Sequence, residues 1–140
     1  MESSDYHGND NSFSYICFNP IANFIIKDNQ ITKNYPDLTN EKYIAIDLET
    51  KDPDLRARGS GAIQGRGEIV GIAVAVEGWK GYYPIAHEGG GNMDKKKVIE
   101  YFKSVLSTPA TKIFHNAMYD VCFIRAAGLE IAGKIVDLSL

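Results

Sequence analysis

Two acidic residues, Asp47 and Glu49, directly follow an apolar run that ends at Ile46. Side chains two residues apart on a strand point to the same face, so these carboxylates would lie together at the carboxyl end of that strand. Two carboxylates this close repel each other, and a divalent cation that prefers oxygen ligands, Mg²⁺ or Mn²⁺, would remove the repulsion. Taken alone, the pair is also explained by a strand that simply leaves the core through polar residues.

A third acidic residue, Asp120, lies on the face of a predicted helix that should pack on the sheet. The other residues of that face are apolar: Ala117, Val121, Ile124 and Ala127. An ionised carboxylate there is costly unless it is paired or binds a metal. In the first turn of the helix it could instead reach backbone N–H groups or an arginine. If the helix follows a central strand, one edge of the sheet could present Asp47, Glu49 and Asp120 to one another.

Hydrophobic periodicity predicts the strands that would position the first two carboxylates. The continuous apolar run Tyr43–Ile46 is typical of a central strand buried on both faces. Two further apolar runs, Ile69–Val76 and Trp79–Ile85, are separated by Glu77 and Gly78 and predict a hairpin. Three consecutive strands of this kind indicate an antiparallel meander.

The second half of the chain alternates helices and strands. In order, the expected elements are an amphipathic helix over Asp94–Leu106 capped by Asn92 or Asp94, a strand over Thr111–His115, a helix over Ala117–Ala127 with Asn116 as N-cap and Gly128 as its stop, and a strand at Ile135–Val136. This order predicts an α/β fold with a mixed sheet.

Outside these elements, residues 1–14 are rich in Ser, Asn, Asp and Gly and are interpreted as a mobile tail. Residues 15–40 are interpreted as a small extended or hairpin appendage, and residues 41–140 as the main domain. Lys51–Gly67 is expected to be a mobile loop, and its arginines (Arg56, Arg58 and Arg66) either solubilise it or contact a phosphate backbone. His87, which precedes Glu88 and three glycines, is interpreted as a turn residue.

Composition limits the possible functions. The chain has 140 residues, enough for one domain, and a net charge of −3, so it has no general basic surface for nucleic acid. The two cysteines, Cys17 and Cys122, lack the spacing of a zinc or redox site and are expected to be reduced thiols. The N-terminus is acidic and polar rather than a signal peptide, and no apolar run reaches membrane-spanning length. We therefore expect a soluble cytoplasmic or cytosolic protein with no membrane partner.

Two short motifs give the chain a family resemblance. Asp47-Leu48-Glu49-Thr50 resembles the first motif, and Asn116-Ala117-Met118-Tyr119-Asp120 the second, of the DEDD superfamily of 3′-5′ exonucleases. The amino-acid sequence around these motifs, over about residues 43 to 138, is similar to that of the proofreading domain of phage-type family A DNA polymerases. The resemblance implies an RNase H-like fold and an enzyme that hydrolyses the terminal phosphodiester at the 3′ end of single-stranded DNA.

The resemblance also implies a site with two divalent metal ions, Mg²⁺ or Mn²⁺. Asp47 would bridge both ions, Glu49 would hold the one that activates water, and Asp120 would hold the second, partly through water. Thr50 and Asn116 would help to place the terminal nucleotide. Two ions roughly 3.5–4 Å apart can activate a water and stabilise the leaving oxygen, which is what phosphodiester hydrolysis needs.

One family feature is missing from the sequence. The family has a fourth carboxylate in a Tyr-x-x-x-Asp or His-x-x-x-Asp motif downstream of the second motif, and Asp137 does not match it. We therefore expect the chain to be a C-terminally truncated part of a longer polymerase, with the polymerase domain in the same parent chain. The alternatives are a stand-alone DEDD exonuclease acting on RNA or DNA and a non-catalytic exonuclease-like domain that binds DNA.

Overall fold

The computed structural model describes residues 34–52, 61 and 67–139. The predicted tail, most of the predicted appendage, Cys17 and the three loop arginines lie outside these residues. The described elements are β1 (Tyr43–Lys51), β2 (Glu68–Val76), β3 (Trp79–Pro84), α3 (Lys95–Leu106), β4 (Thr111–Phe114), α4 (Ala117–Ala126) and β5 (Ile135–Asp137). Every predicted strand and helix of the main domain is therefore present, with boundaries shifted by a few residues.

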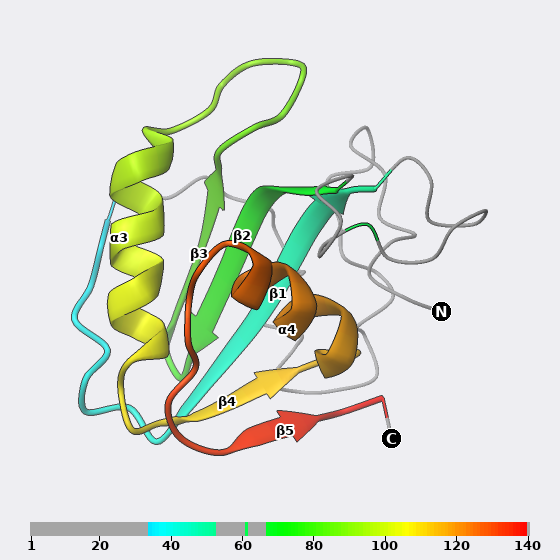
Figure 1. Ribbon diagram of the computed structural model, residues 1–140. Coiled ribbons are helices and arrows are strands. Elements are labelled where there is room, and N and C mark those ends of the chain that lie inside the picture. Colours follow the sequence, from blue (N-terminus) through cyan, green and yellow to red (C-terminus); the bar gives the residue numbers. More distant parts are fainter. Residues whose placement is uncertain (1–33, 53–60, 62–66, 140) are drawn as a thin grey trace.

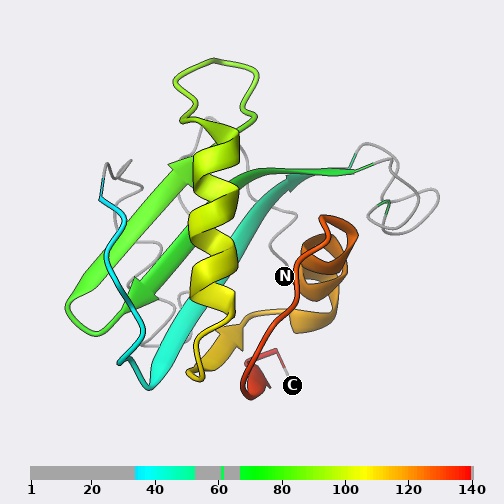
Figure 2. The ribbon, with the colours of Figure 1, turned by 60° about the vertical axis from the view of Figure 1, so that its left-hand side comes forward.

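The strands form one five-stranded sheet in the order β3-β2-β1-β4-β5. The β1–β2 and β2–β3 pairs are antiparallel, whereas β1–β4 and β4–β5 are parallel. Both helices cover the same face of this sheet (Figures 1 and 2), as right-handed crossovers require for two connections that run in the same direction. The α/β fold with a mixed sheet expected from the sequence, a three-stranded antiparallel meander followed by helix, strand, helix and strand, is confirmed.

The sheet packs its apolar rows against α3. Leu48, Ile72 and Tyr83 are paired across β1, β2 and β3, and the Tyr83 ring lies 5.6 Å from that of Tyr101 on α3. Successive residues of a strand alternate between faces, so the neighbouring row must point to the face away from α3. That row contains Asp47, and the register of the sheet therefore places its side chain on the opposite face from Leu48.

The helix α3 begins at the cap that its sequence allows. Of the two candidate N-caps, Asp94 is the one used, and its side chain accepts a hydrogen bond from the backbone N–H of Lys97. Asn92 instead bonds the backbone of His87, accepting from its N–H and donating to its carbonyl oxygen. The apolar side of α3 is buried through Val98, Phe102, Val105 and Leu106.

The buried side chain of Lys112 links the segment after α3 to the segment before β5. Lys112 is fully buried in β4, and its ammonium group donates to the carbonyl oxygens of Thr108 and Ala132. Burial lowers the pKa of Lys112, and the two carbonyls compensate for part of the lost hydration. The segment after α3 and the segment before β5 are thereby tied together, which brings β4 and β5 into register.

Within the described residues, no helix is long and apolar enough to cross a lipid bilayer. Cys122 is a partly buried free thiol.

Candidate functional site

Asp47 and Glu49 lie side by side on β1, as the strand geometry predicted. Their exposed fractions are 2% and 7%, so both carboxylates are buried rather than leading out to solvent. The residues that face them on β2 are small: Asp47 pairs with Ala73, and Glu49 pairs with Gly71. The interpretation of this pair as a polar exit from the core is therefore wrong, because a strand that leaves the core would expose both side chains.

Burial changes the ionisation of Glu49. It raises the pKa of Glu49 to about 7, although the hydroxyl of Tyr82 donates to Oε2 at 2.7 Å and opposes part of the shift. His87 lies behind this contact, with Nε2 at 2.6 Å from the Tyr82 oxygen and 3.7 Å from Glu49 Oε2. Burial therefore makes the ionised form of Glu49 less favourable than it is for a glutamate in water.

Asp120 is the most deeply buried carboxylate. It is 0% exposed, and neither of its side-chain oxygens makes a hydrogen bond of normal geometry within the described part of the chain. Burial raises its pKa well above the ordinary value, and the negative charge of Asp47 adds to the shift. The backbone N–H of Leu48 on β1 opposes part of it. Asp120 therefore lies within electrostatic reach of Asp47, which is what a shared cation would require.

The start of α4 differs from the prediction. Asn116 stands at the N-cap position but has a left-handed backbone (φ 67°, ψ 61°), and its side chain makes no capping hydrogen bond. Asp137 on β5 caps the helix instead, because its two oxygens accept from the backbone N–H groups of Asn116 and Ala117 at 3.1 Å each. Asp137 also accepts hydrogen bonds from Ser139, and together the four donors lower its pKa.

Because Asp137 holds the first turn of α4, it also determines where Asp120 sits. We expect Asp137→Asn to lower the free energy of unfolding by about 1–2 kcal/mol, the usual cost of a lost N-terminal cap. The measurement is urea unfolding of the wild-type chain and the variant. Ser139→Ala is the matched control, since it removes one donor to Asp137 and leaves the cap, and equal destabilisation by the two substitutions would contradict the capping role.

The two residues predicted to contact a nucleotide lie near the end of β1 and at the start of α4. Thr50 is half-buried in β1, and its hydroxyl is 2.8 Å from the hydroxyl of Tyr119 on α4. This bond joins the end of β1 to the first turn of α4. Sequence reasoning missed Tyr119 as a partner of Thr50, because the two are 69 positions apart. Contact of Thr50 and Asn116 with a nucleotide stays a prediction.

The carboxylates of the site have the chemistry of ligands for a hard cation. Among residues 34–52, 61 and 67–139, no three His, Cys, Asp or Glu side chains already form a group that could hold a metal ion. The donors nevertheless fit a hard divalent cation, since Asp120 is a fully buried carboxylate with both oxygens unsatisfied and with a second carboxylate in electrostatic reach. A cation at this position would offset the cost of burying the two charges.

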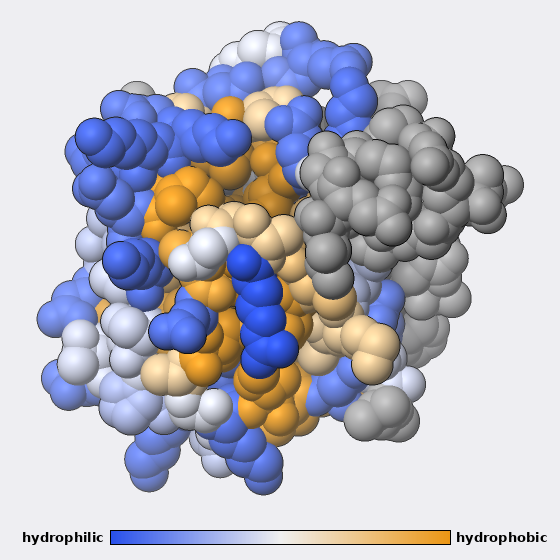
Figure 3. Space-filling view, viewed as in Figure 1, coloured by the Kyte–Doolittle hydropathy of each residue, from blue (hydrophilic) through white to orange (hydrophobic). Residues whose placement is uncertain are grey.

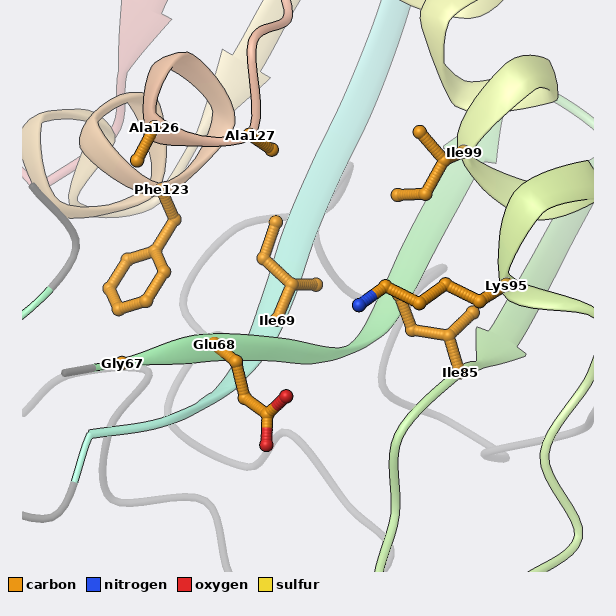
Figure 4. Close-up of a pocket in the computed structure, with 9 residues that line it drawn as sticks. All are labelled: Gly67, Glu68, Ile69, Ile85, Lys95, Ile99, Phe123, Ala126 and Ala127. Atoms are coloured by element: carbon orange, nitrogen blue, oxygen red, sulfur yellow. The ribbon is translucent and has the colours of Figure 1, made fainter. Parts of the chain in front are cut away.

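A hollow on the helical face is separate from these carboxylates. Apolar side chains reach the surface between α3 and α4 (Figure 3). The hollow contains Ile69, Ile85 and Ile99 on one side and Phe123 of α4 on the other (Figure 4). None of the three acidic residues of the candidate site lines it. Its lining also includes the charged residues Glu68 and Lys95, so it is apolar only in part.

No protein-family model matches the chain. Solved structures with a similar fold include NrnC of Brucella melitensis, with 21% sequence identity and a TM-score of 0.44 over 71% of this chain and 43% of that chain. Another is the POL domain of Pol1 from M. smegmatis in complex with DNA primer-template and dNTP, with 12% identity and a TM-score of 0.46 over 70% of this chain and 15% of that chain.

The sequence itself has a much nearer relative. Over 100 residues it is 41% identical to a DNA-directed DNA polymerase of Pseudomonas phage M6. The match spans 68% of this chain and 15% of the phage protein, so the chain corresponds to a small part of that relative. The chain is thus related to phage DNA polymerases, as its motifs at Asp47–Thr50 and Asn116–Asp120 suggested.

Proposed function

We propose that this chain is part of the 3′-5′ exonuclease domain of a phage-type family A DNA polymerase, and that the domain removes nucleotides from the 3′ end of single-stranded DNA during proofreading. The observation that carries the proposal is Asp120. Its carboxylate is fully buried, has no hydrogen bond of normal geometry among the described residues and lies within electrostatic reach of Asp47, and it belongs to a chain related to a DNA polymerase.

The residues that would hold the cations are Asp47, Glu49 and Asp120. Two Mg²⁺ or Mn²⁺ ions, when bound, supply an activated water and stabilisation of the leaving oxygen of a phosphodiester. The protein's own part is to hold three carboxylates at one edge of a rigid sheet and to shield them from bulk water. Thr50, whose hydroxyl contacts that of Tyr119, and Asn116, which has a left-handed backbone, would orient the terminal nucleotide.

The remainder of the site would come from other parts of a longer polymerase. The matched segment is 15% of the phage relative, and a fourth carboxylate with a tyrosine or histidine partner would complete the ligands. The polymerase domain of the same parent chain would supply the primer end to be trimmed. Such a protein would act where phage DNA is replicated, in the host cytoplasm.

The test is trimming of a single-stranded DNA labelled at its 5′ end, in Mn²⁺ and in chelator. We expect a longer polymerase segment that contains this chain to shorten the DNA only with metal, and the 140 residues alone to shorten it hardly at all. In the longer segment, Asp47→Ala should reduce the rate about a thousandfold or more, because catalytic groups that act as a unit fail together.

The matched control is Glu100→Gln, which changes an exposed carboxylate on α3. It should trim at the wild-type rate. Trimming that survives chelator, or that is the same in Asp47→Ala and Glu100→Gln, would overturn the proposal.

A further inference from the structure

Glu49 is held by a hydrogen-bonded chain that crosses the sheet. The Tyr82 hydroxyl on β3 lies 2.7 Å from Glu49 Oε2 and 2.6 Å from His87 Nε2. The direct separation between His87 Nε2 and Glu49 Oε2 is 3.7 Å, too long for a hydrogen bond. Tyr82 is therefore the link between the histidine and the carboxylate.

The number of available protons determines which group donates and which accepts in these two hydrogen bonds. A phenol has one proton to donate, and an ionised carboxylate can only accept. When Glu49 is ionised, Tyr82 must donate to Glu49, so the hydrogen between Tyr82 and His87 has to come from the imidazole. The chain then runs from His87 Nε2–H to the Tyr82 oxygen, and from the Tyr82 O–H to Glu49 Oε2. A neutral imidazole in this arrangement must therefore be the tautomer with its proton on Nε2.

The His87 end of these hydrogen bonds is fixed by its surroundings. The backbone of His87 is held by two hydrogen bonds to the side chain of Asn92, at 2.8 Å and 2.9 Å. Asn92 was a predicted helix cap, and this contact explains why it is not used as one.

The position of the Tyr82 hydroxyl depends on a glycine. Gly71 lies on β2, between Glu49 and β3, and a Cβ atom there would stand 1.9 Å from the Tyr82 oxygen and 2.5 Å from the ring carbon that bears it. No other residue would leave room for the hydroxyl. The Tyr82 hydroxyl therefore occupies the space that a side chain at position 71 would fill, and it reaches Glu49 from there.

We propose that Tyr82, oriented by His87, is a positioning residue that fixes the Glu49 carboxylate for binding of a divalent cation. Tyr82 donates its hydrogen bond to Oε2 of Glu49. This bond orients the carboxylate, and Oε1 takes no part in it. Outer partners of this kind orient metal ligands, and their removal typically costs 10- to 100-fold in metal affinity. The inference rests on the proposed function, because it needs Glu49 to be a ligand.

The experiment compares two adjacent tyrosines. Tyr82→Phe removes the hydroxyl that contacts Glu49, whereas Tyr83→Phe removes a buried hydroxyl that donates to the carbonyl oxygen of Asn34. Mn²⁺ affinity is measured by titration calorimetry on the 140-residue chain, and the His87 tautomer by ¹⁵N NMR without metal at a pH well above the Glu49 pKa of about 7, where Glu49 is ionised. We expect Tyr82→Phe to weaken Mn²⁺ binding about tenfold and to remove the preference for the Nε2–H tautomer, and Tyr83→Phe to change neither.

Gly71→Ala provides an independent variant in which every tyrosine and carboxylate is retained. It displaces the Tyr82 hydroxyl sterically and should weaken Mn²⁺ binding as Tyr82→Phe does. Binding by Tyr82→Phe as tight as by the wild type, or a wild-type His87 with its proton on Nδ1, would overturn the inference alone. A wild-type chain that binds no Mn²⁺ would overturn the proposed function and the inference together, so the two failures are distinguishable.

Discussion

Asp120→Asn should make the metal-free chain more stable while abolishing metal-dependent trimming by the longer polymerase segment. The asparagine has nearly the volume of aspartate, so it leaves no cavity, but it removes a buried charge that has no hydrogen bond of normal geometry from the described residues. It also removes the repulsion from Asp47 that raises the pKa of Asp120. We expect the free energy of unfolding at neutral pH to rise by about 1–3 kcal/mol.

The measurement is urea unfolding at pH 7.5 in chelator, together with the trimming assay. Asp137→Asn is a useful contrast, because the same chemical change is made to a carboxylate whose hydrogen bonds are all satisfied. The two substitutions should change stability in opposite directions. A destabilised Asp120→Asn variant would mean that this carboxylate has a structural partner in the folded chain, and its assignment as a metal ligand would lose its main support.

Functional sites often contain a charged residue that destabilises the fold, as expected of Asp120, close to one that stabilises it, as expected of Asp137. Sites that bind charged ligands often retain groups that destabilise the unliganded fold, and the stability is recovered elsewhere or when the ligand binds. In this chain, the apolar rows against α3 supply the stability, whereas the row that contains Asp47 carries the charge. The two roles are separated by the alternation of side chains along a single strand.

The sequence was sufficient to predict the elements and the burial of Asp120. The period-2 and period-3.6 patterns are local, and both the fold class and the order of strands and helices follow from them. Asp120 could be identified because a carboxylate within an apolar stripe conflicts with its own helix. The predicted convergence of Asp47, Glu49 and Asp120 on one cleft stays a prediction, although Asp47 and Asp120 influence each other.

The residues that sequence reasoning missed depend on contacts between distant segments. Asn116 was expected to cap α4 because it is the right residue type at the right position, but Asp137 on β5 takes that role from 20 positions away. The contact between Tyr82 and Glu49 depends on the register of three strands and on the missing side chain of Gly71. A glycine within an otherwise β-branched run was the one signal in the sequence, since it often marks close approach of another group.

The free energy of unfolding of the metal-free chain should fall as the pH rises from acid to neutral, the opposite of the usual acid denaturation. The pKa values of Glu49 and Asp120 are both raised in the folded state, the former from 4.5 to about 7. A raised carboxyl pKa contributes stability that is present below the unfolded value and is lost as the pH rises through the folded value. The lowered pKa of Asp137 acts in the opposite sense, so its contribution is lost only as the pH falls below the ordinary value of 3.8. The metal-free chain should therefore be most stable at about pH 4–5 and lose stability towards pH 8.

A divalent cation should abolish the loss of stability at high pH, because it binds the ionised carboxylates. Its binding should be tightest at the pH values where the uncompensated negative charge destabilises the fold most. At a concentration a hundred times its dissociation constant, Mn²⁺ should add about 2.7 kcal/mol, which corresponds to a rise in Tm of roughly 10 °C for a domain of this size. Thermal unfolding at pH 5 and pH 8, with Mn²⁺ and with chelator, measures both effects. The stabilisation by Mn²⁺ should be large at pH 8 and small at pH 5, and the double variant Glu49→Gln, Asp120→Asn should show neither the pH dependence nor the metal effect. Equal stabilisation at both pH values, or stabilisation that persists in the double variant, would place the cation on other carboxylates of the chain.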